Sequence, residues 1–155
     1  MQLFAIVPQR VYIQPFGSSL ADNIAYPSTI DMKNKASGMK VVDILISVGL
    51  LYLLDQYKDK GKDKDNNPID SFRNEDKEEM RYVDLVFRHD IDWSSTLSGG
   101  ERQRIAISRV MYSKPSFALL DESFNALPML EGQRLIKLLS DKQTYNIGLV
   151  VISSN

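Results

Sequence analysis

The sequence contains no cysteine, no long apolar run and no excess of charge of either sign. Without cysteine, the chain forms neither disulfides nor thiolate metal sites. Its longest apolar stretch, residues 44–54, is much shorter than the ~20 residues of a membrane-spanning helix. Lysine and arginine (19) nearly balance aspartate and glutamate (20), so the net charge of −1 provides no general attraction to nucleic acid or membranes. We therefore expect no spanning segment within these residues and no nucleic-acid partner.

Also missing is the sequence G-x-x-x-x-G-K-[ST], the loop that wraps the phosphates of a bound nucleotide. Gly61-Lys62 does not provide it, because Gln56 stands where the first glycine belongs and Asp63 where Ser or Thr belongs. The single histidine, His89, is better explained as a surface or packing residue than as a catalytic one. With 43% hydrophobic residues over 155 positions, the chain can still bury the core of one domain.

Residues 97–104 contain a helix start with exposed backbone donors. Ser98 and Glu101 form the S-x-x-E pattern of a capping box, which predicts that a helix begins here. Gly99 and Gly100 occupy its first turn and allow a phosphate or another backbone to approach closely. Because a helix N-terminus has unpaired N–H groups and a partial positive charge, this segment is a candidate for anion binding.

A second motif, residues 117–122, is an apolar strand that ends in two carboxylates, Asp121 and Glu122. In a parallel sheet such a strand is buried on both faces and presents its last residues at the ligand-binding edge. We expect Asp121 to face a hydrated Mg²⁺ and Glu122 to act as base or water-positioning residue for attack on the γ-phosphate of ATP. Gln9 follows another apolar strand, residues 3–7, which Pro8 ends.

Each motif has a plainer explanation when it is taken alone. The Ser98 pattern occurs in ordinary capped helices, and Asp121 and Glu122 are residue types that favour helix N-termini. A glutamine after a proline, such as Gln9, is usually a loop residue. Their order along one chain favours the nucleotide interpretation, with ATP and Mg²⁺ as cofactors.

The remaining pattern predicts an α/β fold. Apolar periodicity indicates helices within residues 17–27, 39–54, 75–87, 98–114 and 129–139 and strands at 3–7, 117–120 and 147–152. Residues 58–67 alternate lysine and aspartate around a glycine, and we expect a solvated loop there. This order of elements fits part of a phosphate-binding α/β fold with an inserted helical subdomain.

Residues 97–104 resemble the signature motif of ABC-type ATPases, residues 117–122 their Walker B strand with its catalytic glutamate, and residues 6–10 their Q-loop. The following stretch is similar to the peroxisomal fatty-acid half transporters, the adrenoleukodystrophy-protein group, at Tyr12, Gly17 to Leu20, Asp22 to Ile24, Tyr26-Pro27 and Asp92-Trp93. The resemblance implies a partial P-loop NTPase fold, with residues 1–155 as a partial nucleotide-binding domain. Within it, residues 18–115 would be the mostly helical subdomain with the signature motif, and 57–75 a charged, disordered insertion.

The same resemblance implies roles for single residues. Glu122 would be catalytic, Asp121 and Gln9 would bind the metal, and the nucleotide would be bound by Gln9, Leu97, Ser98, Gly99, Gly100 and Glu101. The implied partners are a second nucleotide-binding domain, in a homodimer or heterodimer, and a transmembrane domain that this sequence does not contain. The implied location is the cytosolic face of a membrane, which in the half-transporter group is the peroxisomal membrane.

The sequence departs from the family pattern in three places. The phosphate loop is absent, no histidine follows residues 153–155, and Pro128 replaces the aspartate expected shortly after the catalytic glutamate. Two hypotheses remain: a fragment that couples ATP hydrolysis to transport, or a truncated, inactive remnant or binding module with the ABC fold. A soluble ABC protein of DNA repair or translation fits less well, because the sequence has no basic patch. We expect the isolated chain to hydrolyse ATP negligibly.

Overall fold

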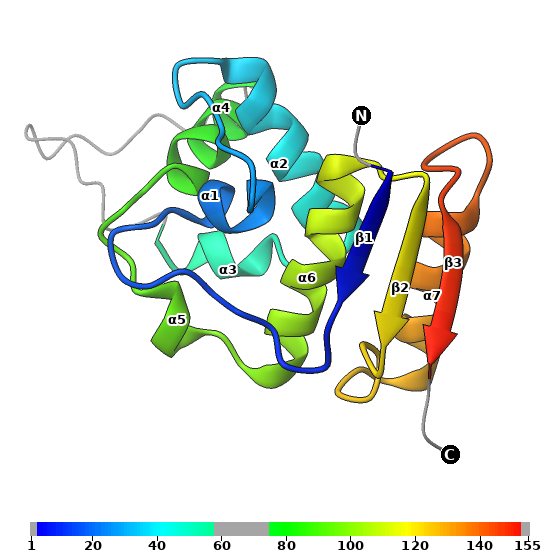
Figure 1. Cartoon of the computed structure of the whole chain (residues 1–155). Helices are drawn as coiled ribbons and strands as arrows, with labels where there is room; N and C mark the ends of the chain where they lie inside the picture. The colour runs from blue at the N-terminus through cyan, green and yellow to red at the C-terminus, as the bar shows by residue number, and fades with distance from the viewer. Residues whose placement is uncertain (1–2, 58–74, 153–155) are drawn as a thin grey trace, which may run out of the picture.

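The computed structural model describes residues 3–57 and 75–152. In Figure 1 the strands lie side by side at one end of the molecule, helices α1 to α5 gather at the other end, and α6 lies between them. The elements in chain order are β1 (Phe4–Val7), α1 (Leu20–Ala25), α2 (Lys35–Ser47), α3 (Tyr52–Asp55), α4 (Glu75–Val86), α5 (Trp93–Thr96), α6 (Gly99–Ser113), β2 (Phe117–Asp121), α7 (Met129–Ser140) and β3 (Gly148–Ile152).

The three strands form one parallel sheet in the order β1-β2-β3. The register places Val7 opposite Leu120 and Leu120 opposite Val151. Because all strands run in the same direction, their carboxyl ends meet at one edge of the sheet. Asp121 ends β2 at this edge, and the loop with Gln9 leaves β1 there. The predicted mixed α/β fold with a parallel sheet is confirmed.

β2 is buried on one face only, although we expected burial on both. Ala118 and Leu120 are fully buried, whereas Phe117 is 55% exposed. Side chains two residues apart and opposite one another in the register share a face. The face with Phe117 also exposes Phe4, Ile6, Val150 and Ile152. Helix α6 packs on β1 and α7 on β3, and within the described residues the helices cover only the other face.

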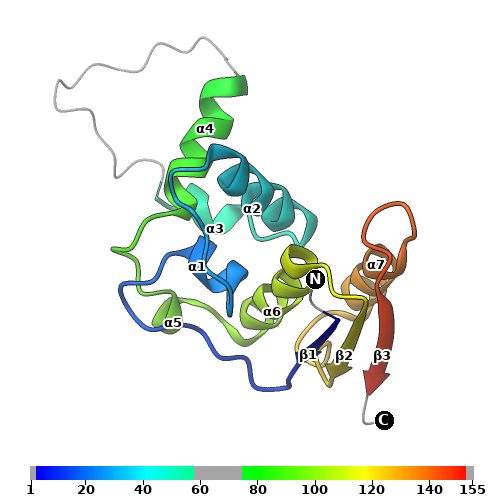
Figure 2. The ribbon, with the colours of Figure 1, turned by 45° about the horizontal axis from the view of Figure 1, so that its top comes forward.

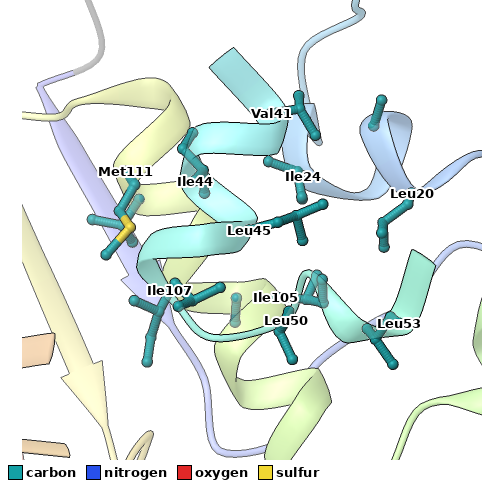
Figure 3. Close-up of a cluster of buried hydrophobic side chains, with 14 of the residues drawn as sticks. Leu20, Ile24, Val41, Ile44, Leu45, Leu50, Leu53, Ile105, Ile107 and Met111 are labelled. Carbon is teal, nitrogen blue, oxygen red and sulfur yellow. The ribbon is translucent and has the colours of Figure 1, made fainter. Parts of the chain in front are cut away.

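The helices pack around an apolar core between α6 and the group formed by α1, α2 and α3. Figure 3 shows Leu45 of α2 and Ile24 of α1 directed into this cluster, with Ile105 of α6 beneath them. All three side chains are fully or almost fully buried. Figure 2, from a second direction, shows α1 and α2 on the side of α6 away from the sheet. This packing fixes the position of α6, and with it the start of the signature helix.

The single helix predicted for residues 39–54 is wrong, because the chain breaks at Gly49. Helix α2 ends at Ser47, and Gly49 adopts a left-handed backbone with φ +68°. The N–H of Leu50 donates to the carbonyl of Leu45 at 2.8 Å, and that of Gly49 donates to Ile46 at 3.0 Å. This pair of hydrogen bonds is a Schellman motif, the usual end of a helix at glycine. Gly49 is therefore a helix terminator and not part of an apolar helix face.

The helices predicted within residues 17–27, 75–87 and 98–114 are confirmed. Ser19 is the N-cap of α1 and forms a capping box with Asp22, and α4 buries Val83, Leu85 and Val86. Helix α6 ends before Pro115, as the proline required. The charged segment 58–67 and most of the predicted insertion 57–75 lie outside the described residues. Within the described residues, none of the helices has the length and apolarity needed to cross a membrane.

Candidate functional site

Gln9 and Glu122 meet at the carboxyl edge of the sheet. The side-chain Nε2 of Gln9 donates to Oε2 of Glu122 at 2.5 Å, although 113 positions separate the two residues. The contact exists because β1 and β2 are neighbours whose ends lie side by side. The structure thus brings together the glutamine and the glutamate that the sequence patterns selected independently.

The backbone of Glu122 is unusual, with φ +49°. A non-glycine residue in this left-handed region is strained and persists only where its surroundings hold it. The N–H of Glu122 donates to the carbonyl of Ile152 at 2.9 Å. The next residue, Ser123, is fully buried, and its Oγ donates to the carbonyl of Val7 at 2.8 Å. These two bonds tie the loop after β2 to the ends of both neighbouring strands.

Asp121 is the last residue of β2, beside this loop and partly buried. The described residues hold no group of three or more histidine, cysteine, aspartate or glutamate side chains that would enclose a metal. Mg²⁺ in nucleotide sites needs only one or two protein oxygens, because phosphates and water supply the rest. The carboxylate of Asp121 and the amide oxygen of Gln9 fit such a nucleotide-held ion, and they do not fit a metal cage made of protein alone.

The signature helix begins as predicted. Ser98 is the N-cap of α6: its Oγ accepts from the N–H of Glu101 at 3.4 Å, and Oε2 of Glu101 accepts from the N–H of Ser98 at 2.7 Å. Tyr52 of α3 donates its hydroxyl to the other oxygen of Glu101. Partial burial opposes ionisation of Glu101, but the hydrogen bonds from Ser98 and Tyr52 outweigh it and hold the pKa of this carboxyl below its ordinary value.

The two glycines of the signature have different surroundings. A Cβ on Gly99 would meet no atom within 4 Å. A Cβ on Gly100 would lie 3.0 Å from the carbonyl oxygen of Ala126, in the loop that follows Glu122. Packing within the chain therefore explains Gly100, whereas the described residues give no packing reason for Gly99. Leu97, just before the helix, is buried in the core at 4% exposure.

Gln103 belongs to the site, and the sequence analysis missed it. Its Oε1 accepts from the N–H of Ala126 at 3.1 Å, and its Nε2 donates to the carbonyl of Glu122 at 3.5 Å. The sequence does contain one indication of its burial: Gln103 lies four positions before the apolar Ile107, and residues four apart share one face of a helix. Gln9, Gly99, Gln103 and Ala126 also line one open hollow of about 390 Å³. The hollow links the start of the signature helix to the edge of the sheet.

A parallel sheet with paired acids at its carboxyl edge, beside a capped helix start, defines an α/β domain of the nucleotide-binding class. The family model described as "ABC transporter" matches residues 4–125. The chain belongs to the ABC transporter family. The match ends within the loop that follows Glu122, so it includes the three segments that resemble the Q-loop, signature and Walker B motifs, residues 6–10, 97–104 and 117–122.

Two curated relatives agree with this assignment, and a solved structure shares the fold. The chain is 30% identical over 122 residues to ABC transporter D family member 1 from Arabidopsis thaliana, which covers 78% of this chain and 7% of that protein. It is 35% identical over 88 residues to the methionine import ATP-binding protein MetN of Escherichia coli O157:H7, covering 57% of this chain and 25% of that one. A bacterial Atm1-family ABC exporter with ATP bound matches the fold with a TM-score of 0.60 at 20% identity, over 98% of this chain and 21% of the exporter chain. The chain therefore spans at most a quarter of the length of these relatives.

Proposed function

We propose that this chain is the energy-coupling part of an ABC transporter, in which ATP binding and hydrolysis drive transport. The observation that supports this most directly is the contact between Gln9 and Glu122 beside Asp121. In this arrangement Glu122 orients the attacking water or accepts its proton, and Gln9 holds the carboxylate of Glu122 in place. Bound Mg²⁺ would neutralise phosphate charge, with Asp121 and Gln9 as its protein ligands.

The signature segment acts on a nucleotide held by a second nucleotide-binding domain. Ser98 caps α6 through its side chain, and the space beside Gly99 is open. The backbone N–H groups of the first turn and the helix dipole favour an anion at this position. A γ-phosphate presented by a partner domain fits it best.

Within the family, we assign the chain to the peroxisomal fatty-acid half-transporter group, with a fatty acyl substrate. Two observations support this subgroup: the residues between Tyr12 and Pro27 that resemble it, and the similarity to ABC transporter D family member 1. The location that follows is the cytosolic face of the peroxisomal membrane. The competing hypothesis, an inactive remnant, rests on the missing phosphate loop and on Pro128, whereas the assembled contacts of Gln9, Glu122 and Ser98 favour a working site.

Complex formation with a complete nucleotide-binding domain tests the proposal. The chain is mixed with the nucleotide-binding domain of the Arabidopsis relative, whose own catalytic glutamate is changed to glutamine so that ATP persists. Sedimentation velocity should detect a heterodimer with MgATP and none with MgADP. Gly99→Asp should abolish the heterodimer, because its carboxylate would repel the phosphate without disturbing the chain.

The matched control is Gln133→Glu, which adds one negative charge at an exposed position of α7. This variant should form the heterodimer as the unmodified chain does. An ATP-dependent complex that Gly99→Asp leaves intact would contradict the role of the signature segment. Absence of any ATP-dependent complex with the unmodified chain would favour the inactive remnant instead.

A further inference from the structure

We propose that Gln103 is a positioning residue that holds Glu122 for its reaction and links it to the signature helix. The catalytic meaning of this inference rests on the function proposed above. Its structural part, that the amide of Gln103 determines where the carboxylate of Glu122 lies, stands independently of that function.

The amide of Gln103 bridges two points of the loop that follows β2. It accepts from the N–H of Ala126 at 3.1 Å and donates to the carbonyl of Glu122 at 3.5 Å. The side chain is only 6% exposed, so water competes little for either bond. An amide carries a strong donor and a strong acceptor on separate atoms, so one side chain can serve both partners at once. A single residue of α6 thereby closes the loop over residues 122–126.

This bridge acts on the residue whose backbone is strained. Glu122 has φ +49°, and such a conformation relaxes unless neighbouring groups fix both sides of the residue. The carbonyl of Ile152 accepts from the N–H of Glu122 at 2.9 Å. The carbonyl of Glu122 accepts from the N–H of Asn125 at 3.2 Å and also from the side chain of Gln103. Of these contacts, only the one with Gln103 comes from a helix. Loss of the hydrogen bond from Gln103 should let the backbone of Glu122 relax and should move the carboxylate of Glu122 away from Gln9.

The first turn of α6 presses on the same loop. The Cα of Gly100 lies so close to Ala126 that a Cβ would stand 3.0 Å from its carbonyl oxygen. With the bonds of Gln103 one turn further on, α6 and the loop are joined at two successive turns. A displacement of α6 caused by a phosphate at Ser98 and Gly99 must therefore move Glu122 of the same chain. In this way a contact with the partner's nucleotide reaches the chain's own carboxylate.

If Gln103 served only to fill space in the core, its substitution would have a different effect. Methionine has nearly the volume of glutamine, and a buried site that needs only volume accepts it with little change. Gln103→Met keeps the volume but removes both hydrogen bonds: it leaves the N–H of Ala126 without its acceptor and the carbonyl of Glu122 with only the N–H of Asn125 as donor. Gln103→Glu retains an acceptor for Ala126 and replaces the donor to the carbonyl of Glu122 with a carboxylate oxygen that repels it.

Nuclear magnetic resonance of the full 155-residue chain tests the structural part. The side-chain amide signals of Gln9 report its bond to Glu122, and Glu122→Ala provides the reference for a released Gln9. In Gln103→Met we expect the Gln9 signals to move to this reference and the exchange of the Ala126 amide to rise at least tenfold. In Gln103→Glu the Gln9 signals should move while the Ala126 amide stays protected. Gln133→Met, at an exposed position of α7, should change neither.

The amides of Leu45 and Ile105 in the helical core serve as the test of folding. If Gln103→Met unfolds the chain, Gln103→Glu alone decides the proposal. Gln9 signals that stay unchanged in a folded Gln103 variant would overturn it.

The functional part is tested in a longer form of the protein that carries the phosphate loop, because the 155 residues alone have no such loop to hold ATP beside Glu122. There, Gln103→Met should leave the amount of ATP-dependent dimer unchanged and lower turnover at the site of Glu122 at least tenfold, with the KM for ATP unaltered. Equal losses of complex and turnover would overturn the positioning role. If even the unmodified chain forms no complex, the proposed function fails while the resonance result on Gln9 still decides the role of Gln103 within the chain.

Discussion

Gly100 of the signature helix lies directly against Ala126 of the loop that follows Glu122. A Cβ added to Gly100 would stand 3.0 Å from the carbonyl oxygen of Ala126, closer than an unstrained contact allows, whereas a Cβ on Gly99 would meet nothing. One glycine is thus required by the fold of this chain. Within the described residues, no contact requires the other.

Alanine substitutions at the two glycines should therefore differ in stability. Both gain the same helix propensity, about 1 kcal/mol at most, so the difference between them isolates the clash. We expect Gly100→Ala to be less stable than Gly99→Ala by about 1–3 kcal/mol, the usual cost of overpacking a tight site. Urea unfolding of both variants measures this difference. Equal stabilities of the two variants would mean that the loop at Ala126 moves away from the added Cβ without destabilising the chain.

The pKa of Glu101 gives a pH-dependent prediction. The folded-state pKa is depressed below the ordinary value of 4.5, so the stabilisation is fully present above pH 4.5 and is lost as the pH falls through the lower folded-state pKa. Tyr52→Phe removes one donor to the carboxylate and should raise its pKa toward 4.5. Carbon-13 titration of the Glu101 carboxyl measures the shift. Tyr82→Phe, which removes a hydroxyl bonded to Asp55, should leave this titration unchanged.

The sequence was sufficient for features that depend on neighbouring residues. The capping boxes of Ser19 and Ser98 were predictable because each is complete within four positions. The contact between Gln9 and Glu122 was predictable only in outline, since strand ends reveal which edge a residue occupies but not its bonding partner. The spacing of Gln103 from Ile107 could indicate its burial but not its hydrogen bonds, because these reach a loop that begins 19 positions away. The exposed face of the sheet was missed for a related reason: apolar strands do not reveal which faces are covered.

Gly49 was misassigned for a further physical reason. Its neighbours are apolar at helical spacing, and the pattern has no sign of the left-handed backbone that ends α2. Gly49→Ala should destabilise the chain by about 1–2 kcal/mol, because a Cβ is unfavourable at φ +68°. Gly132→Ala is the matched comparison, since Gly132 lies inside α7 and its Cβ would make ordinary contacts with Phe124 at 3.4 Å. It should be neutral or stabilising by up to about 1 kcal/mol. Thermal unfolding that ranks the two variants in the opposite order would show that the Schellman motif is unimportant.

Hydrolysis by the isolated chain should be negligible. Loss of a single preorganised contact to the developing charge lowers the rate by about 10²–10³, and the sequence lacks the whole phosphate loop. Phosphate release from MgATP by the purified chain, compared with Glu122→Gln, measures this. A turnover like that of a complete domain, abolished by the substitution, would refute the expectation.

In a longer form of the protein that carries the phosphate loop, Glu122→Gln should instead separate binding from hydrolysis. The substitution keeps the shape of the side chain and the donor–acceptor contact with Gln9, but it removes the charge that draws a proton from the attacking water. Asp121 remains in place for the metal, so ATP should stay bound and the closed dimer should persist. Fluorescent nucleotide titration should give an unchanged dissociation constant, while the rate of single-turnover hydrolysis at this site falls by a factor of at least about 10², as expected for loss of a general base.

Asp121→Asn is the contrasting variant, because weakening the metal ligand should reduce Mg²⁺-dependent nucleotide binding as well. If Glu122→Gln lost binding and hydrolysis to the same extent, the strained residue would serve the architecture of the sheet edge and not the chemistry.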